Sequence, residues 1–188
     1  VYTQPVTAYL DHNGVAVVDP LLADAGSTDN CGIFTRGLSQ SIFTCNNVGP
    51  NLVNLAVLDA SRNTSTDSLT ITILDTLAPV VSVQPATVYL DVNGQANLTT
   101  SQVNNNSSDN CGVASLSIDS SNFDCSELGA NTVALTVTDI NGNSASATTQ
   151  VTVMDAINPI ALTQNVTAYL DASGIATVLP GDVDNGST

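Results

Sequence analysis

Aspartates recur along this chain at a constant spacing, and their carboxylates can bind a cation or accept hydrogen bonds. The spacing is 80 positions, from Asp11 to Asp91 and again from Asp91 to Asp171. The same spacing relates three further pairs: Asp29/Asp109, Asp59/Asp139 and Asp75/Asp155. Carboxylates, Asn side chains and backbone carbonyls are the hard oxygen ligands that Ca²⁺ prefers. Asp also accepts hydrogen bonds from nearby backbone N–H groups in turns. Turn chemistry and calcium binding are therefore both open interpretations.

The cysteines follow the same spacing. Cys31 and Cys45 correspond to Cys111 and Cys125, and each pair is separated by 14 positions, 31 to 45 and 111 to 125. We expect one disulfide within each copy, because a loop of about 15 residues contributes roughly 3 kcal/mol to stability. The alternative, a metal-binding or redox thiol pair, lacks a CxxC motif and a partnering histidine. Disulfides predict an oxidising, extracytoplasmic location.

Catalysis has little support in the sequence. The single histidine, His12, is replaced by Val92 and Ala172 at the equivalent positions. A Ser-His-Asp arrangement needs a histidine held in a concave site. Glycoside hydrolysis needs two carboxyl groups facing each other across a cleft, whereas these aspartates fall at expected turns. We therefore predict no catalytic residues and no enzyme activity.

Composition excludes several partners. The 188 residues carry a formal net charge of −15, and Arg36 and Arg62 are the only basic residues besides His12. Binding to phosphate backbones or to anionic membrane surfaces needs clustered Lys and Arg. No apolar run reaches the length of a membrane span, so we expect neither nucleic-acid binding nor direct membrane insertion. The hydrophobic fraction of 43% is ample for a folded core.

The aspartate spacing belongs to a repeat that organises the whole chain. The segments "TAYLDHNG", "TVYLDVNG" and "TAYLDASG" begin at Thr7, Thr87 and Thr167. We assign residues 1–77 to repeat 1, 78–157 to repeat 2, and 158–188 to the start of a truncated third repeat. The chain is expected to be a window of a longer array.

Within a repeat the apolar residues have a period of two, which is typical of β-strands. In "NTVALTVTD", Val133, Leu135 and Val137 share one face, and Val151 and Val153 do so in "ATTQVTVMD". We expect seven strands in repeat 2, near 80–83, 87–91, 95–99, 113–118, 122–127, 132–138 and 146–154. A short helical turn is possible within 99–110, and Asn93-Gly94 favours a two-residue hairpin turn. The predicted fold is all-β, with tandem immunoglobulin-like β-sandwiches.

The connections between repeats are short and contain proline, "DTLAP" at 75–79 and "DAINP" at 155–159, so we expect a rod of repeats stacked end to end. If the seven strands alternate in direction, aspartates from adjacent repeats meet at each junction. The first junction would gather Asp29, Asp75, Asp91 and Asp139, and the second would gather Asp109, Asp155 and Asp171. Because the chain has no lysine, a cation such as calcium would relieve the repulsion between them.

The repeated motifs also carry a resemblance. "DNCG" at 29–32 and 109–112, a second cysteine, "VTDINGNSA" at 137–145, "VTVMD" at 151–155 and a linker proline are in register. Together they resemble hyalin-repeat-like modules of immunoglobulin fold, and more closely the tandem repeats of giant surface adhesins of gliding Bacteroidetes (SprB-like gliding-motility adhesins). That resemblance implies type IX secretion and a place in a long surface filament.

The resemblance also implies a modification, because proteins of these bacteria are O-glycosylated at Ser or Thr between Asp and an aliphatic residue. Ser68 in "DSL" and Thr76 in "DTL" match this pattern. The expected function is a structural and adhesive segment of an extracellular filament or adhesin stalk. Its expected partners are neighbouring repeats, other filament chains or surface polysaccharide. The alternatives are a carbohydrate-binding module of a secreted enzyme and a self-assembling filament subunit.

Overall fold

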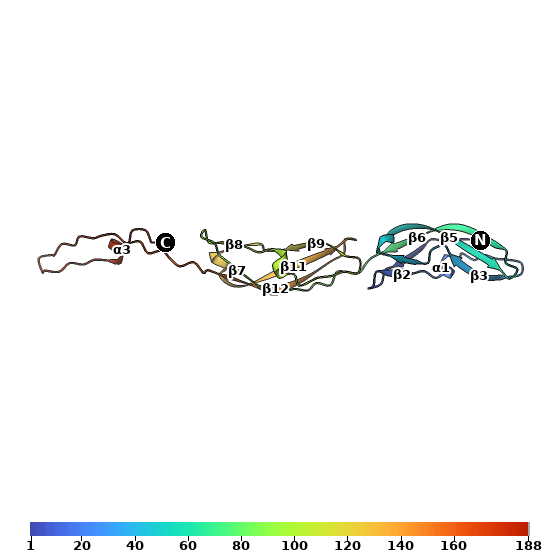
Figure 1. The fold of residues 1–188 in the computed structure, drawn as a ribbon, viewed down its shortest axis with the longest axis horizontal. Helices are drawn as coiled ribbons and strands as arrows, with labels where there is room; N and C mark the ends of the chain where they lie inside the picture. The colour runs from blue at the N-terminus through green and yellow to red at the C-terminus, as the bar shows by residue number, and fades with distance from the viewer. Residues whose placement is uncertain (188) are drawn as a thin grey trace.

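The computed structural model describes residues 1–187 and contains two similar β-sandwiches arranged end to end. Figure 1 shows the sandwich of repeat 1, a narrow connection, the sandwich of repeat 2, and an extended segment that begins near residue 158. The predicted all-β fold of tandem sandwich repeats is confirmed. The predicted domain boundaries at 77/78 and 157/158 stay predictions.

Repeat 1 is built from two small sheets that face each other. Its elements are β1 (Val6–Tyr9), β2 (Val15–Val17), α1 (Pro20–Ala23), β3 (Ile33–Leu38), β4 (Ile42–Thr44), the 3₁₀ turn η1 (Cys45–Asn47), β5 (Gly49–Asp59) and β6 (Thr64–Leu74). One sheet has the strand order β1-β6-β5-β3, and the other pairs β2 with β4. Strand β1 runs parallel to β6, so both strands end on the side of repeat 2.

Repeat 2 has the same topology. Its elements are β7 (Ala86–Tyr89), β8 (Gln95–Asn97), α2 (Thr100–Val103), β9 (Val113–Ile118), β10 (Asn122–Asp124), η2 (Cys125–Glu127), β11 (Gly129–Asp139) and β12 (Ser144–Met154). The sheets are β7-β12-β11-β9 and β10-β8. Helix α2 confirms the helical turn expected within 99–110. The strand expected at 80–83 forms only two isolated bridges, Val80 with Ser108 and Val83 with Asn104.

Each sandwich has its own core, formed by the alternating apolar residues of its strands. In repeat 2, Val133, Leu135 and Val137 of β11 are fully buried. Val151 and Val153 of the adjacent strand β12 are buried in the same core, as the period of two predicts. The buried residues of repeat 1 form a separate cluster. Since each core is complete within one repeat, the contacts between repeats are made by loops at the ends of the sandwiches.

Strand direction within a repeat decides which loops reach the junction. In repeat 1, β5 is antiparallel to β6, and β3 is antiparallel to β5. The turn at 11–14 reverses the chain, so β2 runs opposite to β1. Strand β4 is antiparallel to β2 and therefore runs in the direction of β1. Strands β3 and β4 therefore run in the same direction, and residues 39–41 carry the chain from one sheet to the other rather than forming a hairpin. The sequence-based assumption of strictly alternating strands was wrong at this point.

The turn that opens each repeat differs from the predicted two-residue hairpin. Gly94 has a φ of +72°, but Asn93 does not have positive φ, as a two-residue type I′ turn would require. Instead, Gly94 N–H donates to the carbonyl of Asp91, and the Asp91 carboxylate accepts from the N–H groups of Asn93 and Gln95. The Asp side chain therefore organises a four-residue turn.

Residues 158–187 reproduce the first elements of a repeat without its core. Helix α3 (Pro180–Val183) corresponds to α1, and the bridge between Thr163 and Asp184 corresponds to that between Thr3 and Asp24. Leu170 is 72% exposed, whereas its equivalent Leu10 is 3% exposed, because no partner sheet covers it among these residues.

Within residues 1–187, none of the helices has the length and apolar character that crossing a bilayer requires.

Candidate functional site at the repeat junction

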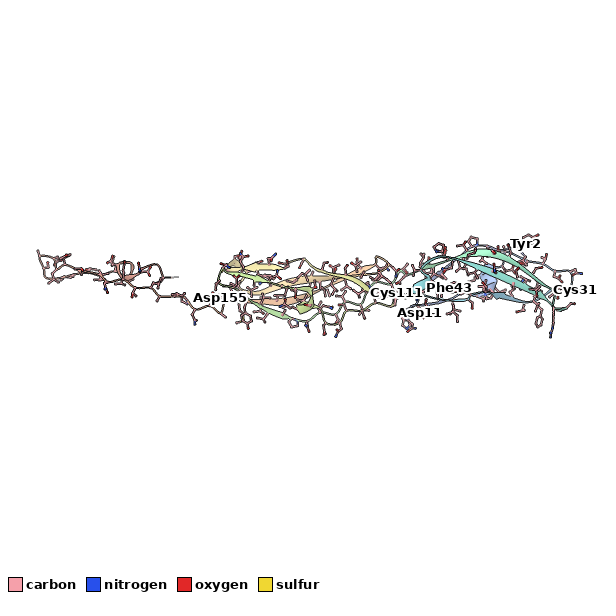
Figure 2. The ribbon with its side chains drawn as sticks, turned by 45° about the horizontal axis from the view of Figure 1, so that its top comes forward. Tyr2, Asp11, Cys31, Phe43, Cys111 and Asp155 are labelled. Carbon is pink, nitrogen blue, oxygen red and sulfur yellow. A yellow bond between two sulfur atoms is a disulfide. The ribbon has the colours of Figure 1, made fainter. Side chains whose placement is uncertain are left out.

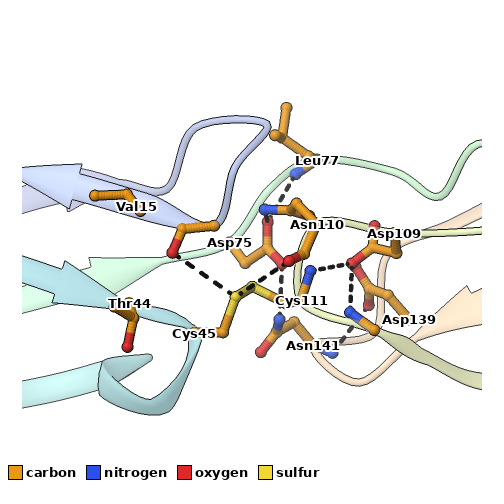
Figure 3. The surroundings of a disulfide bond; sticks show 12 residues. Val15, Thr44, Cys45, Asp75, Leu77, Asp109, Asn110, Cys111, Asp139 and Asn141 are labelled. Atoms are coloured by element: carbon orange, nitrogen blue, oxygen red, sulfur yellow. Dashed lines mark hydrogen bonds between the residues drawn. A yellow bond between two sulfur atoms is a disulfide. The ribbon is translucent and has the colours of Figure 1, made fainter.

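The most informative feature of the junction is a disulfide between the two repeats. Cys45 is the first residue of η1, at the end of the repeat 1 sandwich that faces repeat 2. Cys111 lies in the loop before β9 of repeat 2. The two residues are disulfide-bonded, with their Cα atoms 5.4 Å apart (Figure 3). The predicted pairing within repeats, Cys31–Cys45 and Cys111–Cys125, was therefore wrong. Cys31 and Cys125 are unbonded and exposed.

Strand direction explains this correction. Cys31 lies just before β3 and Cys45 just after β4, and these two strands run in the same direction. The two cysteines of one repeat therefore lie at opposite ends of its sandwich. Figure 2 shows Cys31 at the outer end of repeat 1, away from Cys111 at the junction. The separation of 14 positions carried no information about this crossover.

Asn110, next to the disulfide, connects repeat 2 to two loops of repeat 1. Its Nδ2 donates to the Asp11 carbonyl at 3.1 Å and to Asp75 Oδ1 at 3.3 Å. The Asn110 carbonyl lies against Gly14, where a Cβ atom would come within 2.9 Å of that oxygen and 2.7 Å of Cys45 Sγ. Gly14 also has a φ of +72°, so the turn needs glycine for both its conformation and its contact.

Asp75, the last residue before the linker, accepts hydrogen bonds from both repeats. It is 8% exposed. Asn141 Nδ2 of repeat 2 donates to Asp75 Oδ2 at 2.8 Å, and Asn143 Nδ2 donates to the Asp75 carbonyl at 3.2 Å. Leu77 N–H donates to Asp75 Oδ1 at 3.2 Å and fixes the start of the linker. Asp75 therefore positions repeat 2 relative to repeat 1.

Asp139 ends β11 and organises the turn that faces Asp75. It is 2% exposed, and its Oδ1 accepts from the N–H groups of Asn141 and Asn143 at 2.9 and 2.7 Å. Asn143 Nδ2 donates to Asp139 Oδ2 at 2.7 Å. The turn chemistry predicted for "DINGN" is therefore present. It also directs the side chain of Asn141 toward Asp75 (Figure 3) and that of Asn143 toward the Asp75 carbonyl.

Asp109 completes a cluster of three carboxylates. Its Oδ2 accepts from the N–H groups of Cys111 and Gly112 at 2.8 and 3.1 Å. Oxygens of Asp75, Asp109 and Asp139 all lie within 4.8 Å of one another. At an effective dielectric constant of about 20, two unit charges about 5 Å apart repel by roughly 3 kcal/mol. Among the described residues the one salt bridge, Arg36 with Asp24, belongs to repeat 1 and does not involve this cluster.

The structure thus assembles part of the predicted calcium set. Asp75 and Asp139 meet at the first junction as expected, but Asp109 joins them in place of two other predicted residues, Asp29 and Asp91. The "DNCG" loop faces the preceding repeat and the opening turn faces the following one, which is the reverse of the predicted arrangement. Asp29, Asp91, Asp155 and Asp171 consequently lie away from this cluster. Figure 2 shows Asp155 at the far end of repeat 2.

Outside the cluster, the recurrent aspartates of the opening turns act locally. Backbone N–H groups of Val15 and Asn13 lower the pKa of the exposed Asp11 carboxyl. Those of Gln95 and Asn93 lower the pKa of Asp91 in the same way. The contacts of these two carboxylates are therefore those of turn chemistry.

Sequence reasoning did not select the asparagines of the junction. Asn110, Asn141 and Asn143 make its side-chain hydrogen bonds across the repeats. Asn110 and Asn143 recur as Asn30 and Asn63, and this spacing was a usable signal. An open groove borders the cluster and is lined by His12, Leu77, Ala78, Val80, Ser108, Asp109 and Asn110.

Comparisons with known proteins find similarity only among solved structures. The sequence matches no protein-family model and no curated protein. Human protocadherin-24 EC1-2 is 11% identical over 81% of this chain and 95% of that one, with a TM-score of 0.41. The protocadherin GammaB4 extracellular domain is 15% identical over 88% of this chain, with a TM-score of 0.38, and this chain spans 33% of its length. The fibronectin(III)-like modules of Clostridium thermocellum CbhA are 9% identical over 83% of this chain and 92% of that one, with a TM-score of 0.30.

Proposed function

We propose that this chain is a structural and adhesive segment of a long extracellular cell-surface filament or adhesin stalk, and that it carries no catalytic site. The observation that supports the proposal most is the disulfide between Cys45 and Cys111, because it joins two complete sandwiches covalently in addition to the linker. An enzyme or a compact binding module gains little from such a bond. A stalk gains a fixed direction from one repeat to the next.

The second repeat is prepared for the same kind of disulfide with a following repeat. Cys125 has the same position in repeat 2 as Cys45 in repeat 1, and its Sγ lies 4.0 Å from the Gly94 carbonyl, as Cys45 Sγ lies 3.9 Å from that of Gly14. A following repeat with a cysteine equivalent to Cys111 would bond to Cys125. Tension along the array would then pass through disulfides and through the 14 positions from Cys111 to Cys125 in each repeat.

Location follows from the same bond. A disulfide between folded repeats persists in an oxidising environment and is reduced in the cytosol. We therefore propose an exported protein at the cell surface, with type IX secretion and gliding motility as the specific setting that the sequence resemblance implies. Neighbouring repeats are the proposed partners, together with other filament chains or surface polysaccharide.

A second candidate, a self-assembling filament subunit, is favoured by the two unbonded cysteines. Cys31 and Cys125 are exposed and lie at opposite ends of the two-repeat unit, so separate chains could be joined end to end through them. Non-reducing electrophoresis separates the two candidates. A ladder of disulfide-linked chains that disappears in the Cys125→Ser variant supports self-assembly, whereas a monomer supports a stalk segment.

Small-angle scattering tests the stalk proposal directly. Chains of two, four and six repeats are expected to show a maximum dimension that increases linearly with repeat number under oxidising conditions. The Cys45→Ser variant of the two-repeat chain is expected to give a broader distribution of dimensions because the disulfide no longer limits the angle. A particle whose dimension barely increases with added repeats would reject the stalk.

A further inference from the structure

We propose that the junction binds one calcium ion through Asp75, Asp109 and Asp139, with the side-chain carbonyl of Asn110 as a further oxygen ligand. This inference deepens the proposed function, since the ion would fix the angle between repeats. The three carboxylates come from three separate segments: the residue after β6, the loop before β9, and the last residue of β11. Asp109 and Asp139 are brought together within repeat 2, and Asp75 joins them because repeat 2 docks on repeat 1.

The observation that points to a ligand is a pair of buried oxygens with no hydrogen-bond partner. They are Asp109 Oδ1 and Asn110 Oδ1, on consecutive residues of the junction loop. A buried carboxylate oxygen without a donor is strongly unfavourable, and buried polar atoms are nearly always paired in native proteins. The other oxygen of Asp109 is satisfied by two backbone N–H groups, so the loop is well ordered around the unpaired atom.

Within residues 1–187, no protein group donates to these two oxygens. The chain has no lysine, and Arg36, one of its two arginines, pairs with Asp24 inside repeat 1. The side-chain amides of the junction, Asn110, Asn141 and Asn143, donate to Asp11, Asp75 or Asp139 and not to the two unpaired oxygens. A cation supplies the missing positive charge to both oxygens and to the neighbouring carboxylates.

The number and arrangement of the oxygen ligands favour calcium over magnesium. Calcium accepts six to eight oxygens from carboxylates, amide carbonyls and water in a flexible geometry, whereas magnesium requires a small, nearly ideal octahedron. Asp75 and Asp139 each accept three N–H groups, which leaves about one lone pair of each carboxylate for an ion. The groove beside His12 and Asp109 provides solvent access, and water completes the coordination.

Calorimetric titration of the 188-residue chain with calcium chloride, after treatment with a chelator, tests the site. We expect one ion per chain, with a dissociation constant of about 10⁻⁵–10⁻³ M, from the weakest sensor sites to extracellular modules. Asp109→Asn and Asp75→Asn are each expected to weaken binding by at least about 10-fold. Magnesium chloride at the same concentration is expected to compete poorly.

The repeat supplies matched controls. Asp29→Asn and Asp155→Asn change the equivalents of Asp109 and Asp75 at positions that lack the complete cluster, and both variants are expected to bind as the parent chain does. Because an Asp109 variant could disturb folding, amide NMR spectra of the parent chain provide a second readout. Calcium should shift the signals of Asn110, Cys111 and Asn141 selectively.

Two outcomes overturn the inference. If calcium causes no saturable heat up to about 10 mM, well above the range of extracellular sites, the unpaired oxygens bind water instead. If Asp29→Asn weakens binding as much as Asp109→Asn does, the ion is held by the general negative charge of the chain. Neither outcome affects the disulfide-linked stalk, which scattering tests independently.

Discussion

Cys45 and Cys111 lie in different repeats, 66 positions apart in sequence, with their Cα atoms 5.4 Å apart across the junction. Their disulfide closes a loop that contains β5 and β6 of repeat 1 and β7 and β8 of repeat 2. Tension applied at the two ends of the chain therefore passes through the bond and does not reach residues 46–110. The longest strands of repeat 1 are protected from mechanical unfolding by a bond that lies outside its core.

Single-molecule extension should measure this protection. With the disulfide intact, the fully extended chain is expected to be shorter by roughly 220–240 Å than after reduction, since 66 positions span at most about 3.3–3.6 Å each. Cys45→Ser should give the longer extension under both conditions. Cys31→Ser is the matched control and should behave as the parent chain. Equal extensions before and after reduction would show that the bond does not form.

Much of the fold could be predicted because local pattern and burial agree. The period of two in "NTVALTVTD" placed Val133, Leu135 and Val137 in the core, and all three are fully buried. The spacing of the repeats located equivalent strands in both sandwiches. These predictions depend on residues that contact neighbours within one sheet.

The disulfide pairing could not be predicted, because it depends on strand direction. The connection between β3 and β4, Ser39 to Ser41, is short enough for a hairpin and contains no residue that distinguishes a hairpin from a crossover. Because a hairpin was assumed here, the prediction placed Cys31 at the wrong end of the repeat. For the same reason it placed Asp29 at the first junction, where the structure has Asp109. Long-range pairing was therefore the limit of the sequence reasoning.

Replacing Gly14 tests how closely the repeats approach. Gly14, Gly94 and Gly174 have φ values of +72°, +72° and +77°. Alanine at each position should lose roughly 1–2 kcal/mol from the left-handed conformation alone. Gly14→Ala should lose roughly 1–3 kcal/mol more, because its Cβ would meet the Asn110 carbonyl at 2.9 Å, a backbone atom that cannot move freely.

Thermal unfolding and the rate of disulfide reduction provide the readouts for these glycines. Gly14→Ala should accelerate reduction of the Cys45–Cys111 disulfide, because the added Cβ pushes the two repeats apart. Gly94→Ala should not accelerate it, because the atom nearest to its Cβ belongs to the mobile Cys125 side chain. If Gly14→Ala and Gly94→Ala are equally stable and equally slow to reduce, the junction is looser than the structure shows.

Glycosylation at Ser68 and Thr76 is a prediction from the sequence resemblance. Both residues are exposed, Ser68 on β6 and Thr76 in the linker, so a transferase could reach them in the folded protein. Ser68 Oγ donates to Asn54 Oδ1 at 2.8 Å, and a glycan would remove this donor. Intact-mass analysis of natively secreted protein should show added hexose, absent from the Ser68→Ala, Thr76→Ala double variant. An unmodified peptide covering residues 67–77 would contradict the predicted glycosylation.

Acid should destabilise repeat 1 more than repeat 2, because only repeat 1 contains the partly buried ion pair of Asp24 and Arg36. Burial works to raise the pKa of Asp24, but hydrogen bonds from Ser27 and Arg36 outweigh it and lower the pKa to about 2. The carboxylate therefore stabilises the fold above its unfolded pKa, and this contribution of about 1–2 kcal/mol is lost as the pH falls from about 4 to 2. Repeat 2 has Asn104 and Leu116 at these positions, which do not titrate.

Thermal unfolding at pH 5, 3.5 and 2 should show repeat 1 losing stability faster, and the Asp24→Asn, Arg36→Leu double variant should remove that difference. Parallel acid profiles for the parent and the variant would contradict the assignment.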